Sequence, residues 1–171
     1  MIFLTVGTQL PFPRLIHAVD TLAPTLDEEI FGQIGHGCPS PKNFASSATL
    51  PPIEFEKKFS AARLIISHAG IGTVLAARKH GKPIIIFPRR SGLGEHRNDH
   101  QLATCAQLQG RSGIYVANDD AELGALLQTP NLSAASMTPA DIERRHKLTG
   151  AIMSFIDSNA TASLKHKSGT F

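Results

Sequence analysis

Short, continuous apolar runs, each followed by a stretch with helical spacing, restrict most strongly how this chain can fold. Ile2–Val6 and Leu64–Ser67 are such runs, and Pro83–Phe87, with three isoleucines and a phenylalanine, is the strongest. Continuous rather than alternating apolar runs are typical of strands covered on both faces. The alternation of strands and helices therefore predicts an α/β fold: a single Rossmann-like domain with a mainly parallel sheet.

The same pattern predicts the other elements and the extent of the domain. Further strands are expected over Glu29–Ile34, Phe44–Leu50 and Gly113–Val116. Helices are expected over Phe12–Leu22, Glu54–Ala62, Gly72–His80 (with Gly81 as its stop), Asn98–Gln109 (with Asn98 as its cap), from Asp119, and over Asp141–Ser158. We expect one domain over residues 1–157 and a flexible basic tail over residues 158–171.

Composition excludes several classes of function. The 171 residues are 42% hydrophobic and 18% charged, which is an ordinary globular balance. With no Trp and one Tyr, the chain lacks an aromatic platform for single-stranded nucleic acid. No apolar run approaches the about 20 residues that a membrane span needs. The two distant cysteines, Cys38 and Cys105, are expected to be free thiols in a reducing cytoplasm.

Ligands of parallel sheets bind beyond the carboxyl ends of the strands, where three loops should lie. In the segment Ser67–Thr73, Gly70 and Gly72 would let a ligand approach the backbone, and the N-terminus of the following helix favours a phosphate. The segment also fits a tight turn with glycines for packing. It lacks the endings of a P-loop and of a dinucleotide fingerprint. The loop with Gly7 and Thr8 is either a wall of the ligand cleft or a connection shaped by two prolines.

The segment Pro88–Gln101 is dense in polar groups, with three arginines, two histidines, a Glu, an Asp and a Gln. Such a set can hold sugar hydroxyls and a diphosphate together. His96 and His100 would share a helix face, but further metal ligands are missing, so no metal site is expected.

These segments, in this order, resemble the C-terminal, donor-binding domain of glycosyltransferase family 28. The opening Thr5-Val6-Gly7-Thr8 and Arg14-Leu15-Ile16 are similar to the small catalytic subunit of the eukaryotic two-part N-acetylglucosaminyltransferase. The tandem of Ser67–Thr73 and Glu95–Gln101 looks closer to bacterial split glycosyltransferases of exopolysaccharide synthesis, such as glucuronosyltransferase small subunits. The likeness spans roughly residues 1 to 116.

The resemblance implies half of a GT-B glycosyltransferase and a UDP-sugar donor, carrying glucuronic acid, N-acetylglucosamine or another hexose. It places the diphosphate near Gly70, Ile71, Gly72 and Thr73, the sugar near His100 and Gln101, and the uracil beside Pro52 and Ile53. The implied transfer is inverting and needs no metal or cofactor. The implied acceptor is a polyprenyl-diphosphate-linked sugar, held by a separate membrane-anchored glycosyltransferase subunit. The chain would then be cytoplasmic and peripheral at the inner face of the plasma membrane.

Inverting transfer needs a base for the acceptor hydroxyl and stabilisation of the leaving UDP. Helix-end amides and an arginine among Arg89, Arg90 and Arg97 are the expected stabilising groups. The plausible bases on this chain are His68, Glu95 and His100, although two-domain relatives carry the base on the acceptor domain.

The sequence departs from the family pattern at one position. Ala76 stands where the single-chain peptidoglycan relative has a glutamate that holds the donor ribose, and Glu95 is a candidate substitute. This departure keeps a second interpretation open, a non-catalytic enhancer or binding subunit of a separate membrane glycosyltransferase. A UDP-sugar 2-epimerase would need two domains in one chain, and an NAD-binding domain would need the missing fingerprint.

Overall fold

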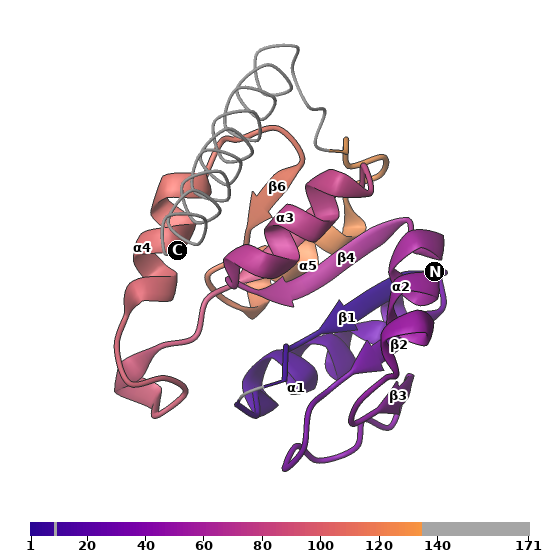
Figure 1. Cartoon of the computed structure of the whole chain (residues 1–171), viewed down its shortest axis with the longest axis horizontal. Helices are drawn as coiled ribbons and strands as arrows, with labels where there is room; N and C mark the ends of the chain where they lie inside the picture. The colour runs from indigo at the N-terminus through magenta and orange to yellow at the C-terminus, as the bar shows by residue number, and fades with distance from the viewer. Residues whose placement is uncertain (9, 135–171) are drawn as a thin grey trace, which may run out of the picture. The chain divides into compact units, whose positions relative to one another are not determined.

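The computed structural model describes residues 1–8 and 10–134, whose strands form one six-stranded sheet in the order β3-β2-β1-β4-β5-β6 (Figure 1). The strands are β1 (Ile2–Thr5), β2 (Ile30–Gln33), β3 (Ala45–Ser47), β4 (Leu64–His68), β5 (Ile84–Phe87) and β6 (Ile114–Val116). The helices are α1 (Pro13–Leu22), α2 (Pro52–Ala61), α3 (Ile71–Lys79), α4 (His100–Leu108) and α5 (Asp120–Gln128), with short 3-10 helices η1 (Ala23–Thr25) and η2 (Ser91–Leu93). Every pair of neighbouring strands is parallel, which confirms the predicted α/β fold.

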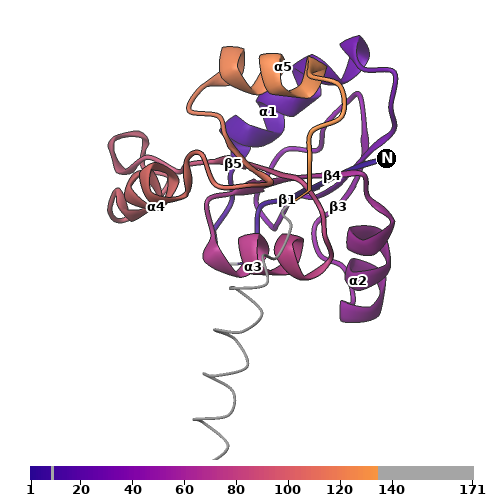
Figure 2. The ribbon, with the colours of Figure 1, turned by 90° about the horizontal axis from the view of Figure 1, so that it is seen from above.

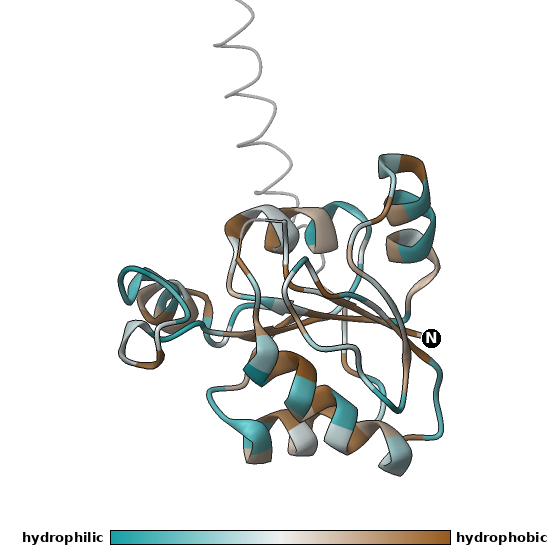
Figure 3. Cartoon of the chain, turned by 90° about the horizontal axis from the view of Figure 1, so that it is seen from below, coloured by the Kyte–Doolittle hydropathy of each residue, from teal (hydrophilic) through white to brown (hydrophobic). Residues whose placement is uncertain are grey.

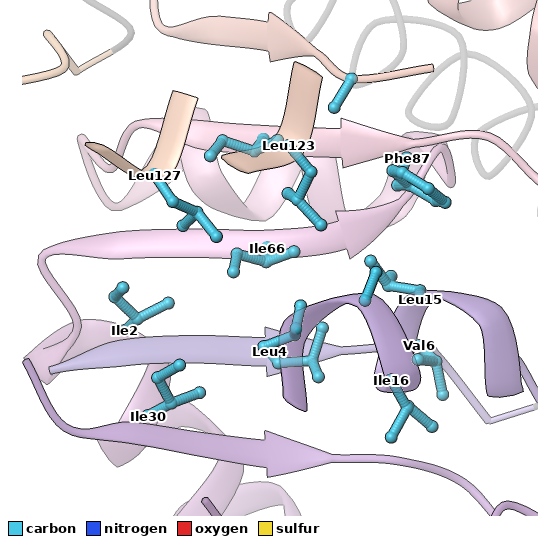
Figure 4. Packing of buried hydrophobic residues seen from close by; sticks show 14 of the residues in the cluster. Ile2, Leu4, Val6, Leu15, Ile16, Ile30, Ile66, Phe87, Leu123 and Leu127 are labelled. Atoms are coloured by element: carbon cyan, nitrogen blue, oxygen red, sulfur yellow. The ribbon is translucent and has the colours of Figure 1, made fainter. Parts of the chain in front are cut away.

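Successive residues of each strand point to opposite faces of the sheet, so the core has two layers. Figure 2 shows α1 and α5 on one face and α2 and α3 on the other. Ile2, Leu4 and Ile66 belong to the core beneath α1 and α5 (Figure 4), whereas Phe3 and Ile65 belong to the core on the other face. Burying each such side chain contributes about 1.5–3 kcal/mol. Figure 3 accordingly shows largely hydrophobic strands between helices in which hydrophobic and hydrophilic residues alternate.

The strand order creates a topological switch point between β1 and β4. From β1 the chain proceeds to β2 and β3 on one side, and it then returns to β4 and continues to β5 on the other side. The connection after β1 leads to α1 on one face, and the connection after β4 leads to α3 on the opposite face (Figure 2). The two loops diverge at the carboxyl edge of the sheet, which is where open α/β sheets leave a ligand-binding crevice.

Local sequence signals located most element boundaries. Gly81 follows α3 with a positive φ of 60°, and the side chain of Asp119 caps α5 by accepting a hydrogen bond from the Glu122 amide at 2.8 Å. The predicted cap at Asn98 is wrong, because α4 begins at His100 and Asp99 occupies the N-cap position. The side chain of Asp99 instead accepts a hydrogen bond from the Ser91 amide at 2.7 Å, so it holds the loop rather than the helix.

The expected helix over Asp141–Ser158, the domain limit at residue 157 and the tail over residues 158–171 lie outside the described residues. Within the described residues, no helix combines the length and the apolar composition needed to cross a lipid bilayer. Cys38 and Cys105 are both free thiols, as expected from their separation in the sequence.

Candidate functional site

A pocket of about 280 Å³ opens at the switch point, between the loops that follow β1, β4 and β5. Eight of the predicted site residues line it: Gly7, Thr8, His68, Gly70, Gly72, Thr73, Arg89 and Gln101. Val6, Leu10 and His96 complete the lining. Segments that are far apart in the sequence are therefore brought to one place by the parallel sheet, as the carboxyl-edge argument predicts.

The His68 ring lies packed between two glycine backbones. A Cβ atom built on Gly70 would lie 2.3 Å from Nε2 of His68, and one built on Gly7 would lie 2.9 Å from its Cε1. Only glycine fits at either position without displacing the ring. Nδ1 of His68 lies 3.3 Å from the hydroxyl of Ser67, which is itself fully buried.

The pKa of His68 is lowered from 6.5 to about 4, chiefly by burial. The nearby guanidinium of Arg89 contributes to the lowering, a hydrogen bond with the backbone of Thr5 opposes it, and the neighbouring His96 adds a smaller lowering effect. His68 is consequently neutral near pH 7. A neutral imidazole can accept a proton, but a pKa of about 4 makes it a weak base.

Helix α3 points its N-terminus at this pocket. Its first turn carries Gly72 and Thr73, and Gly70 at the N-cap makes no side-chain capping hydrogen bond. The first N–H groups of a helix have no partner within the helix and carry a partial positive charge. In this turn the amides of Gly70 and Thr73 already donate to the carbonyls of His68 and Gly70, at 2.7 and 3.2 Å. The amides of Ile71 and Gly72 are therefore the ones that suit an anionic group such as a phosphate.

A second pocket of about 420 Å³ adjoins the first and shares Gly7, Thr8 and Thr73 with it. Its further lining comes from the ends of β1 and β2 and from α2 with the residues before it: Thr5, Gln33, Leu50, Pro52, Phe55 and Glu56. Apolar and aromatic groups mixed with a few polar ones are typical of small-molecule sites. The two pockets therefore lie next to each other along the carboxyl edge of β2, β1, β4 and β5.

Arg89 lies at the pocket but faces away from solvent, with 2% of its surface exposed. Its guanidinium donates hydrogen bonds to three backbone carbonyls of the loop after β1: Val6, Leu10 and Pro11. Because its guanidinium already donates to these carbonyls, the structure does not favour the predicted role of Arg89 as a phosphate ligand. Its backbone amide donates to Oε1 of Gln101 at 3.1 Å, which holds the buried Gln101 side chain at the pocket wall.

Glu95 does not line either pocket. Its carboxylate accepts two hydrogen bonds from Arg14, at 2.7 and 2.8 Å, and a third from the backbone amide of Arg90 at 2.9 Å. Burial raises the pKa of Glu95, but the hydrogen bonds and the two nearby arginines, Arg14 and Arg89, hold it below its ordinary value. The structure therefore favours neither its predicted role as base nor its role as a substitute for the missing ribose ligand.

The remaining predicted residues lie around the site and not in its lining. Nη2 of Arg90 donates to the carbonyl of Asn118 at 2.6 Å, and Arg97 is exposed. Ile53 and Ile71 are 85% and 56% exposed, at the first turns of α2 and α3. His100 is exposed and its Nδ1 contacts the side chain of Asn98.

His96 lines the first pocket, although it was not among the single residues predicted to bind the donor. Its ring packs edge-on against His100 with centroids 4.5 Å apart, and its Nδ1 is buried without a hydrogen-bond partner. His96 lies in the polar segment that the sequence singled out, but only the path of the chain after η2 turns it toward the pocket. Among residues 1–8 and 10–134, no group of three or more His, Cys, Asp or Glu side chains is placed to hold a metal ion.

Comparison with known proteins identifies relatives of this chain and its fold. The family model described as the glycosyltransferase family 28 C-terminal domain matches residues 1–128. The human UDP-N-acetylglucosamine transferase subunit ALG13 is 30% identical over 125 residues, which are 67% of this chain and 11% of the human protein. The chain thus spans about a tenth of the length of this curated relative.

Solved structures show the same fold at low sequence identity. The calicheamicin glycosyltransferase CalG4 aligns over 98% of this chain and 44% of its own, with a TM-score of 0.57 and 16% identity. MurG of Acinetobacter baumannii aligns over 77% and 42%, with a TM-score of 0.55 and 22% identity. The solution structure of ALG13 aligns over 81% and 91%, with a TM-score of 0.55 and 18% identity. The fold is thus that of GT-B glycosyltransferases, of which this chain matches one part.

Proposed function

The chain belongs to the glycosyltransferase family 28 C-terminal domain family, and from this membership we propose that it is the donor-binding subunit of a two-component glycosyltransferase. The proposed donor is a UDP-sugar carrying glucuronic acid, N-acetylglucosamine or another hexose. The proposed acceptor is a polyprenyl-diphosphate-linked sugar of exopolysaccharide or capsule synthesis, held by a membrane-anchored partner subunit. In this proposal the chain works on the cytoplasmic side of the plasma membrane through that partner, and transfer is inverting and independent of metal.

The observation that carries the proposal is the position of the α3 N-terminus between two adjoining pockets. A diphosphate at Gly70–Thr73 would accept hydrogen bonds from the amides of Ile71 and Gly72, since those of Gly70 and Thr73 already donate to backbone carbonyls. The second pocket, with Pro52 and Phe55, offers apolar surface to a nucleobase. Glu56, whose Oε1 lies 3.0 Å from Nε2 of His80, offers its other carboxylate oxygen to a ribose hydroxyl. The first pocket, with His96 and Gln101, would receive the sugar.

The proposed chemistry divides between the two subunits. When the bond to the sugar breaks, negative charge grows on the leaving UDP, and the preorganised amides of α3 would stabilise it without reorganisation. His68 is neutral and lies beside the same amides, but its low pKa makes it a poor base. We therefore assign the base that accepts the proton of the acceptor hydroxyl to the partner subunit.

Donor binding tests the proposal directly. The isolated chain is expected to bind UDP about tenfold or more tightly than uridine, because charge-assisted hydrogen bonds to helix-end amides contribute about 1.5–3 kcal/mol. Isothermal titration calorimetry with UDP, UMP and uridine, with and without a chelator, measures this difference. Sugar transfer is expected only after the acceptor subunit is added. Equal affinity for UDP and uridine would contradict the diphosphate site, and donor binding without any transfer by the reconstituted pair would favour the non-catalytic alternative.

The surface around the site supports a partner that covers it. Among residues 1–8 and 10–134, the exposed large apolar side chains all lie on segments that follow carboxyl ends of strands: Leu10, Ile53, Ile71, Leu75 and Leu93. Leu10 lines the first pocket, and Ile53 and Ile71 lie in the first turns of α2 and α3 at the carboxyl edge of the sheet, where exposed apolar side chains are typical of an interaction surface. In the proposed enzyme, the acceptor-binding domain would close over this edge and complete the cleft.

Leu75 offers a test of this docking surface, because it is 59% exposed and lines neither pocket. Leu75→Lys is expected to weaken binding of the acceptor subunit about tenfold or more, since a charge would be buried against the partner. UDP affinity of the isolated chain should stay the same. Ala125→Lys, at an exposed position on α5 outside both pockets, is the matched control. Co-purification and surface plasmon resonance measure the effect, and an unchanged affinity for Leu75→Lys would exclude this face.

A further inference from the structure

The loop between β1 and α1 forms a wall of both pockets, yet its described residues contain no regular secondary structure. Gly7 and Thr8 line both pockets, and Val6 and Leu10 line the first one. A wall of this kind must hold its shape before a ligand arrives if the site is to bind tightly. Contacts with a side chain from the connection that follows β5 supply that support.

The guanidinium of Arg89 is the group that the loop surrounds. Nη1 donates to the carbonyl of Pro11 at 2.5 Å, while Nη2 donates to the carbonyls of Leu10 at 2.7 Å and Val6 at 3.2 Å. The ring of Phe12 covers the guanidinium, whose central carbon lies 4.4 Å from the ring centroid. The three carbonyls span almost the whole loop, so one side chain from the end of β5 binds the loop at both of its ends.

Arg14 makes a second link in the opposite direction. It belongs to the first turn of α1, immediately after the loop, and reaches back to the connection that follows β5. There its guanidinium donates to the carbonyl of Pro88 at 2.7 Å and binds both carboxylate oxygens of Glu95. Glu95 in turn accepts the hydrogen bond from the Arg90 amide, so the two connections are joined on both sides of Arg89.

We propose that Arg89 is a positioning residue of the donor site: it holds the loop of residues 6–8 and 10–12 in its binding-competent shape and does not itself bind the donor. The Arg14–Glu95 pair supports it by holding the segment that carries Arg89. The identity of the ligand in this inference rests on the proposed function, but the role of Arg89 in the ligand-free protein does not.

The chemistry of arginine explains why this residue type is required. A buried charge is costly unless hydrogen bonds compensate it, and here the carbonyl oxygens of the loop provide the compensation. The planar guanidinium can reach three carbonyls from one fixed fork, whereas the ammonium of lysine presents its donors from a single nitrogen. Arg89→Lys thus keeps the positive charge but loses the geometry that reaches three carbonyls. The variant therefore distinguishes positioning of the loop from simple electrostatic attraction of an anionic ligand.

Hydrogen exchange of the ligand-free protein tests the loop. In Arg89→Lys, peptides that cover the loop are expected to exchange about tenfold or more faster than in the wild type, since fewer carbonyls are held. The amides of Val6 and Phe12 report on the position of the loop, because each donates to an acceptor outside it. The Val6 amide donates to the carbonyl of Gln33, and the Phe12 amide donates to Sγ of Cys38. Arg111→Lys, an exposed arginine outside both pockets, is the control and should exchange like the wild type.

Titrations with UDP and with uridine decide between positioning and direct binding. Positioning predicts that Arg89→Lys weakens both ligands by a similar factor, about tenfold, because the loop lines both pockets. Unchanged loop exchange together with a selective loss for UDP would make Arg89 a phosphate ligand and overturn the proposal. If Arg89→Lys does not fold, Arg14→Lys is measured in the same way. Unchanged hydrogen exchange of the loop between β1 and α1 in that variant would also overturn the proposal. If the wild type binds neither ligand, the proposed function fails, and the exchange experiment alone still decides the role of Arg89.

Discussion

Replacing Gly70 with alanine is expected to lower the affinity for UDP by about tenfold or more, while the chain stays folded. A tenfold loss corresponds to about one hydrogen bond between a helix-end amide of α3 and the charged diphosphate. The backbone of Gly70, with φ −89° and ψ 125°, is accessible to alanine, so the effect is steric. The new Cβ atom would lie 2.3 Å from Nε2 of His68. The ring has no room to retreat toward Gly7, where a Cβ atom would already lie 2.9 Å from Cε1. We expect a loss of about 1–3 kcal/mol in the free energy of unfolding, as for other overpacked sites.

Gly92→Ala is the matched control for this change. Gly92 lies in η2, a Cβ atom there would meet nothing within 4 Å, and the residue lines neither pocket. Calorimetric titration with UDP and chemical denaturation should place this variant with the wild type. If Gly70→Ala bound UDP like the wild type, the packing of His68 between two glycines would have no bearing on the site.

The stability of the protein is expected to fall in acid because of His68. Its folded pKa of about 4 lies below the ordinary value of 6.5, so the neutral ring stabilises the fold fully above pH 6.5. As the pH falls from 6.5 toward 4, the unfolded chain binds a proton that the folded chain does not, and the stabilisation is lost. The shift corresponds to roughly 3 kcal/mol across this window, and the loss levels off below pH 4.

Comparison with His68→Asn isolates this contribution, because asparagine does not titrate. Urea denaturation of both proteins at several pH values between about 7 and 4 gives the free energy of unfolding of each. The wild type should lose roughly 3 kcal/mol more than the variant over this range. Glu28 and Glu95, whose pKa values lie below the ordinary value, lose stability in acid in both proteins, so their contribution cancels in the difference. Equal losses in the two proteins would show that His68 is not held neutral by its surroundings.

The features that were predicted correctly from the sequence depend on nearby residues. Apolar runs of four or five residues located β1, β4 and β5, and Gly81 and Asp119 marked a helix end and a helix start through their own backbone or side-chain chemistry. The parallel order then brought Gly7, Gly70 and Gln101 to one pocket, because carboxyl ends of parallel strands share one edge.

The features that could not be predicted from the sequence depend on distant partners. Nothing in the neighbourhood of Glu95 indicates that Arg14, 81 residues earlier, takes both of its carboxylate oxygens. Arg89 was predicted as a ligand because arginines in a polar loop suit phosphates, yet its partners are carbonyls of the first loop, 78 to 83 residues away. Which of several charged side chains faces the pocket, as His96 does, is set by the tertiary path of the loop and not by residue type.

The two adjoining pockets have a consequence for how donor preference can change. Most of the residues that line only the second pocket come from β1, β2 and the start of α2, and Glu56 is the last of them in the sequence. The first pocket instead takes His68, His96 and Gln101 from β4 and the later part of the fold. Apart from three shared residues, the nucleotide end and the sugar end of the proposed donor would thus be read by separate stretches of sequence. Exchanging residues 96–101 between relatives, with Arg14, Arg89 and Glu95 kept, should therefore alter the choice of sugar and leave the choice of base intact, so that sugar specificity changes independently of the nucleotide end of the site.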